Sequence, residues 1–467
     1  MSFTSLWYFP FLAGVAVIYY FLPGCPRRYF LLAVSWFMYG LFGLLHLLLM
    51  WAVTLITYLA GRLAGMGRKG RKPALVVCII LVAGILFYFK YFDMFFSGVE
   101  FLGGVFGKKL TFSERYMVLP VGISFYTFQS LSYVIDVYRG QVPEKNFANY
   151  ALFLSFFPQL VAGPIEQASW LIPQLETGKA GREDISAGIR YLLSGCVRKF
   201  VIADYMAGIV DEVYANPSGQ SGAALMLMTV FFAIQIYCDF SGYTHIAIGS
   251  GRFLGIRLTE NFDRPYLARG CRDFWKRWHI TLTRWLKEYV YIPLGGNRKG
   301  EGRKCFNIMV VFLLSGLWHG ADMTFVLWGA FFGIWRIAEE KTGVRTGRAV
   351  TFALVCLSWV FFRSQSVPEA FLVLRRIFTW ADGGALPVGV TELAGAALRI
   401  GILALIPRII PESFSPEKTG RTGQTGKCTA NPASKYYVVT VLGFLTAVCL
   451  LAAFGSGGGS SFIYFQF

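Results

Sequence analysis

Long apolar runs recur along this chain and restrict it to very few folds. They are Leu6–Phe21, Ala74–Tyr88, Ala223–Ile236, Phe306–Leu317, Phe325–Ile337, Val350–Phe362 and Tyr437–Phe454. Each approaches the roughly 20 residues that a helix needs to cross the hydrocarbon core of a bilayer. Lipid offers no partners to backbone N–H and C=O groups, so membrane segments must be helices or closed barrels. The runs lack the alternation of barrel strands, and they predict an all-α polytopic membrane protein with roughly 11 transmembrane helices.

The charge of the chain fits this membrane reading better than a nucleic-acid-binding one. Only 15% of the residues are charged, yet the net charge is +18. Lys and Arg accumulate in the cytoplasmic loops of membrane proteins, which by itself gives a basic total. The segment Arg252–Lys304 alone holds 13 basic and 5 acidic residues. We therefore expect membrane lipid as a partner, no nucleic acid, and a cytoplasmic position for this basic segment.

The polar segments divide the chain without creating a second domain. We expect residues 1–467 to form one membrane-embedded domain, with a mobile polar loop at about 412–434. Residues 240–340 are richer in charge, Trp and Gly than the rest. Irregular backbone is tolerated at membrane depth only where it lines a cavity or is buried in protein. This region is therefore predicted to hold re-entrant and interfacial helices around a central funnel. The nine cysteines show no paired spacing, so neither a metal nor a disulfide framework is expected.

Two histidines are the strongest candidates for chemistry. His319 lies in an apolar stretch directly after Trp318, and His279 follows an aromatic and basic run. An ionisable side chain at membrane depth is costly, so it usually lines a polar pathway or a reaction site. Imidazole takes up and returns a proton near neutral pH. The pair therefore indicates acid–base chemistry inside the bilayer, with His319 and His279 as catalytic candidates.

Two further segments are candidates for the wall of the funnel. Asp239, Ser241 and Tyr243 follow directly on an apolar helix. Asp239 either orients a histidine or holds an arginine there, or else it makes a structural hydrogen bond or caps a helix end. Asn261 lies in a stretch that Pro265 biases toward an extended backbone. That stretch is either a wall of the funnel or a plain cytoplasmic loop.

The basic segment contributes the remaining candidate binding residues. Trp275, Arg277 and Trp278 lie at helical spacing, which favours a helix with its Trp side chains at the membrane interface and its basic side chains on an anionic ligand. The alternative is an interfacial anchor helix. Asn297 and Arg298 follow Gly295-Gly296, a pattern typical of a phosphate-cradling turn or simply of a tight turn.

Seven segments together resemble the membrane-bound O-acyltransferase (MBOAT) family, and more closely its bacterial alginate O-acetyltransferase-like branch. They are Leu119–Gln129, Phe157–Ile165, Tyr237–Gly242, Glu260–Phe262, Phe274–His279, Tyr291–Arg298 and Gly316–Gly320. The likeness covers most of the chain and places a catalytic core at about 119–340. One departure stands out, because members often carry Asp after Ser-Gly-Tyr-Ser where this chain has His245 after Thr244.

The resemblance implies an acyltransferase of a bacterial cell membrane, with His319 and His279 at the positions of the family's motif histidines. It implies transfer of an acyl group to an extracellular or cell-wall polysaccharide, with no bound cofactor, and we expect the group to be acetyl from acetyl-CoA. A separate exported acyltransferase or glycan-modifying protein is the implied partner. Three alternatives stay open: D-alanyl transfer to teichoic acid from a carrier protein, a lipid acyltransferase, and a glycan transporter without enzymatic activity.

Overall fold

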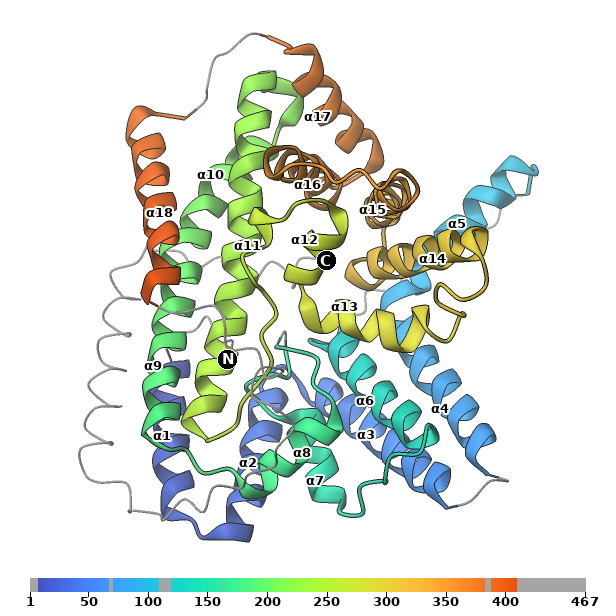
Figure 1. Ribbon diagram of the computed structural model, residues 1–467, viewed down its shortest axis with the longest axis vertical. Coiled ribbons are helices and arrows are strands. Elements are labelled where there is room, and N and C mark those ends of the chain that lie inside the picture. Colours follow the sequence, from blue (N-terminus) through green and yellow to red (C-terminus); the bar gives the residue numbers. More distant parts are fainter. Residues whose placement is uncertain (1–6, 67–69, 109–118, 162, 383–387, 410–467) are drawn as a thin grey trace.

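The computed structural model describes residues 7–66, 70–108, 119–161, 163–382 and 388–409 (Figure 1). Within these ranges the chain is helical and contains no strand, as predicted. The predicted polar loop 412–434 and the final apolar run Tyr437–Phe454 lie outside the described residues.

The helices of the first half are, in chain order, α1 (Tyr8–Phe21), α2 (Gly24–Gly40), α3 (Leu44–Gly65), α4 (Arg71–Leu86), the π-helix η1 (Phe87–Tyr91), α5 (Phe92–Val105), α6 (Ile123–Tyr138), α7 (Phe147–Ser155), α8 (Ala168–Thr177), α9 (Arg182–Cys196), the π-helix η2 (Val197–Ala203) and α10 (Asp204–Tyr214). Those of the second half are η3 (Pro217–Gly219), α11 (Gly222–Phe253), η4 (Pro265–Leu267), α12 (Cys271–Arg277), α13 (Ile280–Leu286), the π-helix η5 (Lys287–Tyr291), α14 (Glu301–His319), α15 (Met323–Thr342), α16 (Arg348–Arg363), α17 (Val367–Thr379) and α18 (Val390–Ile409).

Three stretches of the described chain are long and apolar enough to cross a membrane: α3, the continuous α4–η1–α5 and α11. Their surroundings differ. The most apolar window of α11 is 83% buried, whereas that of α4–η1–α5 is 17% buried. Lipid is as apolar as a protein core, so exposed apolar side chains at the periphery are expected in a bilayer. α11 thus lies inside the protein, whereas α4–η1–α5 lies at its periphery. The total of eleven spanning helices stays a prediction.

Small residues let α9 approach α11 closely. A Cβ atom on Gly195 of α9 would lie 2.7 Å from the carbonyl oxygen of Gly242, and one on Gly249 would lie 2.9 Å from that of Gly188. Close backbone contact through small residues is typical of helix pairs in membranes. α11 continues unbroken to Phe253. The idea that Asp239 caps a helix end is therefore wrong, because tertiary contacts keep that position inside the helix.

α14 and α15 form a second tight pair. A Cβ on Gly316 would lie 2.2 Å from the carbonyl oxygen of Phe325, and one on Gly329 would lie 2.4 Å from that of Phe312. These contacts fix the position of the end of α14 against α15. α12 lies between α11 and α15, and α13 runs beneath α14, where Trp285 stacks on Phe128 of α6 at 3.7 Å (Figure 1).

Candidate active site

The two candidate histidines meet in the interior. His319 is the last residue of α14, and His279 lies between α12 and α13. Their ring centroids are 6.3 Å apart. The side chains are 3% and 0% exposed, respectively, so both are withdrawn from the surface. Residues 40 positions apart in the sequence thus form one imidazole pair.

Aromatic rings enclose this pair. Trp318 packs against both imidazoles, with centroid distances of 5.5 Å to His279 and 4.9 Å to His319. Phe240 of α11 packs edge-on to His279 at 4.8 Å. Trp328 of α15 lies 5.1 Å from His319. A low-dielectric enclosure of this kind strengthens every polar interaction made inside it.

A clamp of hydrogen bonds holds His279 in place. Its backbone adopts a left-handed conformation with φ of 45°, which a residue with a Cβ rarely adopts. The carbonyl oxygen of Asn261 accepts from the backbone N–H of Ile280 at 3.0 Å. Its Oδ1 accepts from the backbone N–H and the hydroxyl of Thr281, at 3.1 and 2.7 Å. Asn261 thus lies in the predicted extended stretch and acts on the residues that follow His279. Outliers of this type persist only where the surrounding structure over-determines them.

The ring nitrogens of the buried His279 keep their hydrogen-bonding capacity. Neither of its ring nitrogens hydrogen-bonds another residue within the described part of the chain. A buried polar atom normally has a partner. The imidazole therefore has the capacity to bind an acyl donor or an oxyanion.

Asp239 and Ser241 belong to a buried ion cluster between α11 and η2. Lys199 lies 2.7 Å from an Asp239 oxygen and 2.9 Å from an Asp204 oxygen. Arg198 donates to the Ser241 hydroxyl at 2.9 Å. The described contacts of Asp239 thus favour a structural role over a role in the site, since buried charges require close partners. Tyr243, one turn further along α11, is 1% exposed.

The aromatic residues of the basic segment do not lie at a membrane interface. Trp275 and Trp278 are 7% and 1% exposed, so the interfacial placement is wrong. The predicted helix forms as α12 and ends before Trp278, where the chain turns and then continues as α13. Trp278 packs on Trp359 at 5.1 Å. Arg277 is held by Asp273 at 2.9 Å and by Asp263 at 3.5 Å, and so braces this turn.

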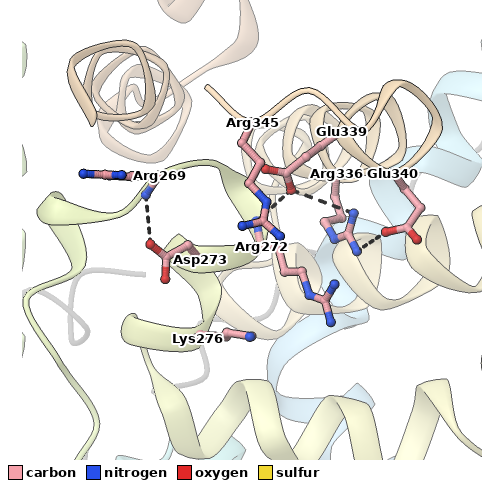
Figure 2. A pocket seen from close by; sticks show the side chains of 9 residues that line it. Arg269, Arg272, Asp273, Lys276, Arg336, Glu339, Glu340 and Arg345 are labelled. Atoms are coloured by element: carbon pink, nitrogen blue, oxygen red, sulfur yellow. Dashed lines mark hydrogen bonds and ion pairs between the residues drawn. The ribbon is translucent and has the colours of Figure 1, made fainter. Parts of the chain in front are cut away.

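A cavity of about 560 Å³ with more basic than acidic lining residues opens beside α12 and the end of α15 (Figure 2). Its charged lining residues are Arg269, Arg272, Asp273, Lys276, Arg336, Glu339, Glu340 and Arg345. Glu339 and Glu340 engage Arg336. Within the described chain, the side chains of Arg272, Lys276 and Arg345 have no carboxylate at ion-pair distance, so these cations are available to an anion.

Glu340 is locked as a carboxylate at the edge of this cavity. Hydrogen bonds from Lys304 and then Arg336 lower its pKa from 4.5 to about 2. It therefore stays ionised at neutral pH and neutralises part of the basic wall.

A second cavity of about 860 Å³ shares Arg272, Lys276 and Arg336 with the first. Asn297 and Arg298 line it, next to the left-handed glycines Gly295 and Gly296. The sequence predicted a turn at these glycines, and the fold shows that this turn and Lys276 line the same cavity. Asp239–Tyr243 do not line either of these two cavities, in contrast to the predicted funnel.

Tryptophan rings separate the second cavity from the histidine pair. Neither His279 nor His319 lines the cavity, but Trp275 does. Trp275 packs on Trp328 at 5.7 Å, and Trp328 packs on His319 at 5.1 Å. These ring contacts connect the wall of the cavity to His319.

Lys90 and Tyr91 contact the site, although the sequence did not single them out. His245, in contrast, takes a structural position between two helices. Lys90 and Tyr91 of η1 hydrogen-bond the end of α14, and the lone lysine in an apolar region was the available signal. His245 lies at the α9–α11 contact, where its Nδ1 is 3.0 Å from the Ser194 hydroxyl.

Comparison with known proteins agrees with this architecture. Residues 31–351 match the model of the MBOAT, membrane-bound O-acyltransferase family. A probable alginate O-acetylase AlgI of Pseudomonas putida is 33% identical over 99% of each chain. A peptidoglycan O-acetyltransferase of Helicobacter pylori is 33% identical over 80% of this chain and 78% of its own length. A teichoic acid D-alanyltransferase of Bacillus subtilis is 25% identical over 52% of this chain and 69% of its own.

The matched region contains both histidines and the elements that hold them. The expected helical membrane fold and acyltransferase class are thereby confirmed. The chain belongs to the membrane-bound O-acyltransferase family, as a multi-pass membrane acyltransferase similar to alginate O-acetylases.

Proposed function

We propose that this protein transfers an acetyl group from a cytoplasmic thioester, acetyl-CoA, toward the hydroxyl groups of an extracellular or cell-wall polysaccharide. The observation that carries the proposal is the buried pair of His279 and His319 beside a basic cavity. The relatives named as O-acetylases act as further support, since they match at 33% identity over most of the chain.

The donor is assigned from the charge and shape of the cavities. CoA carries phosphates and a long thiol-ending arm. Arg272 and Lys276 offer cations for the phosphates, and Arg298 adds another at the Gly295-Gly296 turn. The apolar part of the second cavity, with Trp275 and Phe312, suits the pantetheine arm. Its thioester would then approach His319 along the Trp275 and Trp328 indoles.

The reaction balances as a thioester-to-ester exchange. His319 accepts the proton of the acceptor hydroxyl while the hydroxyl oxygen attacks the acetyl carbonyl carbon. The C–O bond forms, the C–S bond breaks, and the proton passes to the leaving thiolate, which departs as the free thiol. His279 positions the donor or hydrogen-bonds the developing oxyanion. Proton transfer and oxyanion stabilisation each contribute on the order of 2–4 powers of ten in rate.

Charge distribution supports an orientation in the membrane. The basic segment Arg252–Lys304 faces the cytoplasm by the positive-inside rule. Donor entry is then cytoplasmic, in the inner membrane of a bacterium. The acceptor hydroxyl comes from the opposite side, and an exported acyltransferase or glycan-modifying partner delivers the acetyl group to the final polysaccharide.

D-alanyl transfer from a carrier protein is the nearest alternative, because a phosphopantetheine arm fits the same cavity. The teichoic acid D-alanyltransferases are 24–25% identical and cover 47–52% of this chain, which makes acetyl transfer the better-supported choice. A lipid acyltransferase would need a lateral opening toward the bilayer.

Inside-out membrane vesicles containing the protein test the donor. Vesicles are supplied with [14C]acetyl-CoA or with a D-alanyl carrier protein, and ester-linked label and free thiol are measured. Equal amounts of label and thiol from acetyl-CoA, abolished in His319→Ala, are expected. Label transfer from the carrier alone would reject acetyl-CoA as donor.

A further inference from the structure

The end of α14 leaves backbone carbonyls without helical partners. A helix has no N–H donors of its own for its last four carbonyl groups. In α14 these belong to Gly316, Leu317, Trp318 and His319. The N–H of Gly320 satisfies Gly316 at 3.3 Å. The other three must find donors elsewhere, at low dielectric, because an unpaired buried carbonyl costs as much as a lost hydrogen bond.

Two consecutive residues of η1 supply those donors. The Tyr91 hydroxyl donates to the carbonyl of Leu317 at 2.7 Å. The Lys90 ammonium donates to the carbonyls of Trp318 at 2.6 Å and His319 at 3.0 Å. It also lies 3.4 Å from the hydroxyl of Ser124, at the start of α6. Lys90 and Tyr91 thus satisfy every remaining carbonyl of the last turn.

The local backbone of η1 explains how adjacent residues contact the same helix end. A single π-turn inside an α-helix changes the direction of its side chains, and such turns are frequent at functional sites. The two flanking helices continue on either side, as α4 and α5. A cation at a helix C-terminus also complements the negative end of the helix dipole.

We infer that Lys90 is a positioning residue for the acyl transfer, acting through the backbone of Trp318 and His319 rather than on the substrate. This inference rests on the proposed role of His319. Lys90 fixes the backbone from which the His319 imidazole and the Trp318 ring project. Trp318 contacts both imidazoles, so the same contact sets the separation of the pair. Loss of the ammonium leaves two carbonyls unpaired and lets the last turn fray.

The test compares Lys90→Met, Lys90→Arg, Tyr91→Phe and His319→Ala in membrane vesicles supplied with acetyl-CoA. Lys90→Met keeps an apolar stem without a donor, and Lys90→Arg keeps the charge and the donors. Tyr19→Phe is the matched control, because its hydroxyl donates to the carbonyl of Gly178 at 2.9 Å, away from α14. Membrane abundance, kcat, and KM for acetyl-CoA are measured for each variant.

A displaced catalytic base lowers kcat, and a shift of 1 Å costs about 100-fold in rate. We expect Lys90→Met to lose about 10- to 100-fold in kcat at unchanged KM and abundance. Lys90→Arg should recover most of that loss, Tyr91→Phe should lose less, and Tyr19→Phe should match wild type.

Wild-type kcat in Lys90→Met, with His319→Ala inactive, would overturn the inference and leave the proposed function intact. Activity in His319→Ala would instead overturn the proposed function. Should Lys90→Met reduce abundance, Lys90→Gln, which retains an amide donor, replaces it. Gln is one bond shorter than Lys and cannot reach both carbonyls as the ammonium does, so wild-type kcat in Lys90→Gln would then overturn the inference.

Discussion

Gly316→Ala should disable the enzyme by moving α14 rather than by touching its chemistry. A Cβ at this position would lie 2.2 Å from the Phe325 carbonyl oxygen, and real Cβ contacts are essentially never shorter than 3.0 Å. The obstacle is backbone, so it cannot rotate aside. α14 and α15 must separate by about 1 Å, which costs about 1–3 kcal/mol as overpacking. Gly316 lies one turn before His319, so the imidazole moves with the helix.

The expected result is a fall in kcat of about 100-fold, the usual cost of a 1 Å misplacement of a reacting group. The assay is acetyl-ester formation in vesicles, normalised to the amount of protein in the membrane. Gly302→Ala is the matched control, because it lies on the same helix with no atom within 4 Å of an added Cβ. Full activity in Gly316→Ala at normal abundance would refute the claim that α14–α15 contact sets the position of His319.

Three further predictions concern the parts around the histidine pair. Asn261→Ala should lower kcat about 10- to 100-fold, because it removes the acceptor that holds the turn after His279, at about 1–3 kcal/mol for the unpaired groups; Asn149→Ala, in α7, is the control. Arg272→Glu and Lys276→Glu should raise KM for acetyl-CoA at least about 10-fold with little change in kcat, and wild-type KM would exclude them from donor binding. In Glu340→Gln the melting temperature should fall less on acidification than in wild type, as measured in detergent at each pH.

The sign of the Glu340 effect follows from its lowered pKa. Lys304 and Arg336 favour the ionised form, so the carboxylate stabilises the fold at pH values above about 4.5. That contribution is lost as the pH falls from 4.5 to about 2. An equal fall in melting temperature in Glu340→Gln and wild type would contradict the assigned ion pairs.

The features that depend on local sequence were predictable. Apolar runs indicate helices, because backbone groups in lipid must be paired within their own segment. The isolated ionisable residue His319 indicated a candidate site because burial of such a group is costly, and the structure places it beside His279. Pro265 likewise indicated the extended backbone that contains Asn261.

The features that depend on distant partners were not predictable. Asp239 stays inside α11 because Lys199, from η2, supplies its counter-charge. The break at His279 depends on Asn261, whose amide oxygen binds the residue two positions beyond it. Lys90 donates a hydrogen bond to the carbonyl of Trp318, which lies 228 positions away in the sequence. No pattern in a single sequence pairs such residues.

The central claim is that His319 performs proton transfer during acyl transfer to a polysaccharide. The direct measurement is cell-surface glycan O-acetylation in a deletion strain complemented with wild type, His319→Gln, His279→Ala or His46→Gln at equal membrane abundance. His46 is a buried histidine in the first turn of α3 and is the matched control. We expect wild type and His46→Gln to restore the ester and His319→Gln to restore essentially none. Full restoration by His319→Gln would contradict the assignment of His319 as the catalytic base.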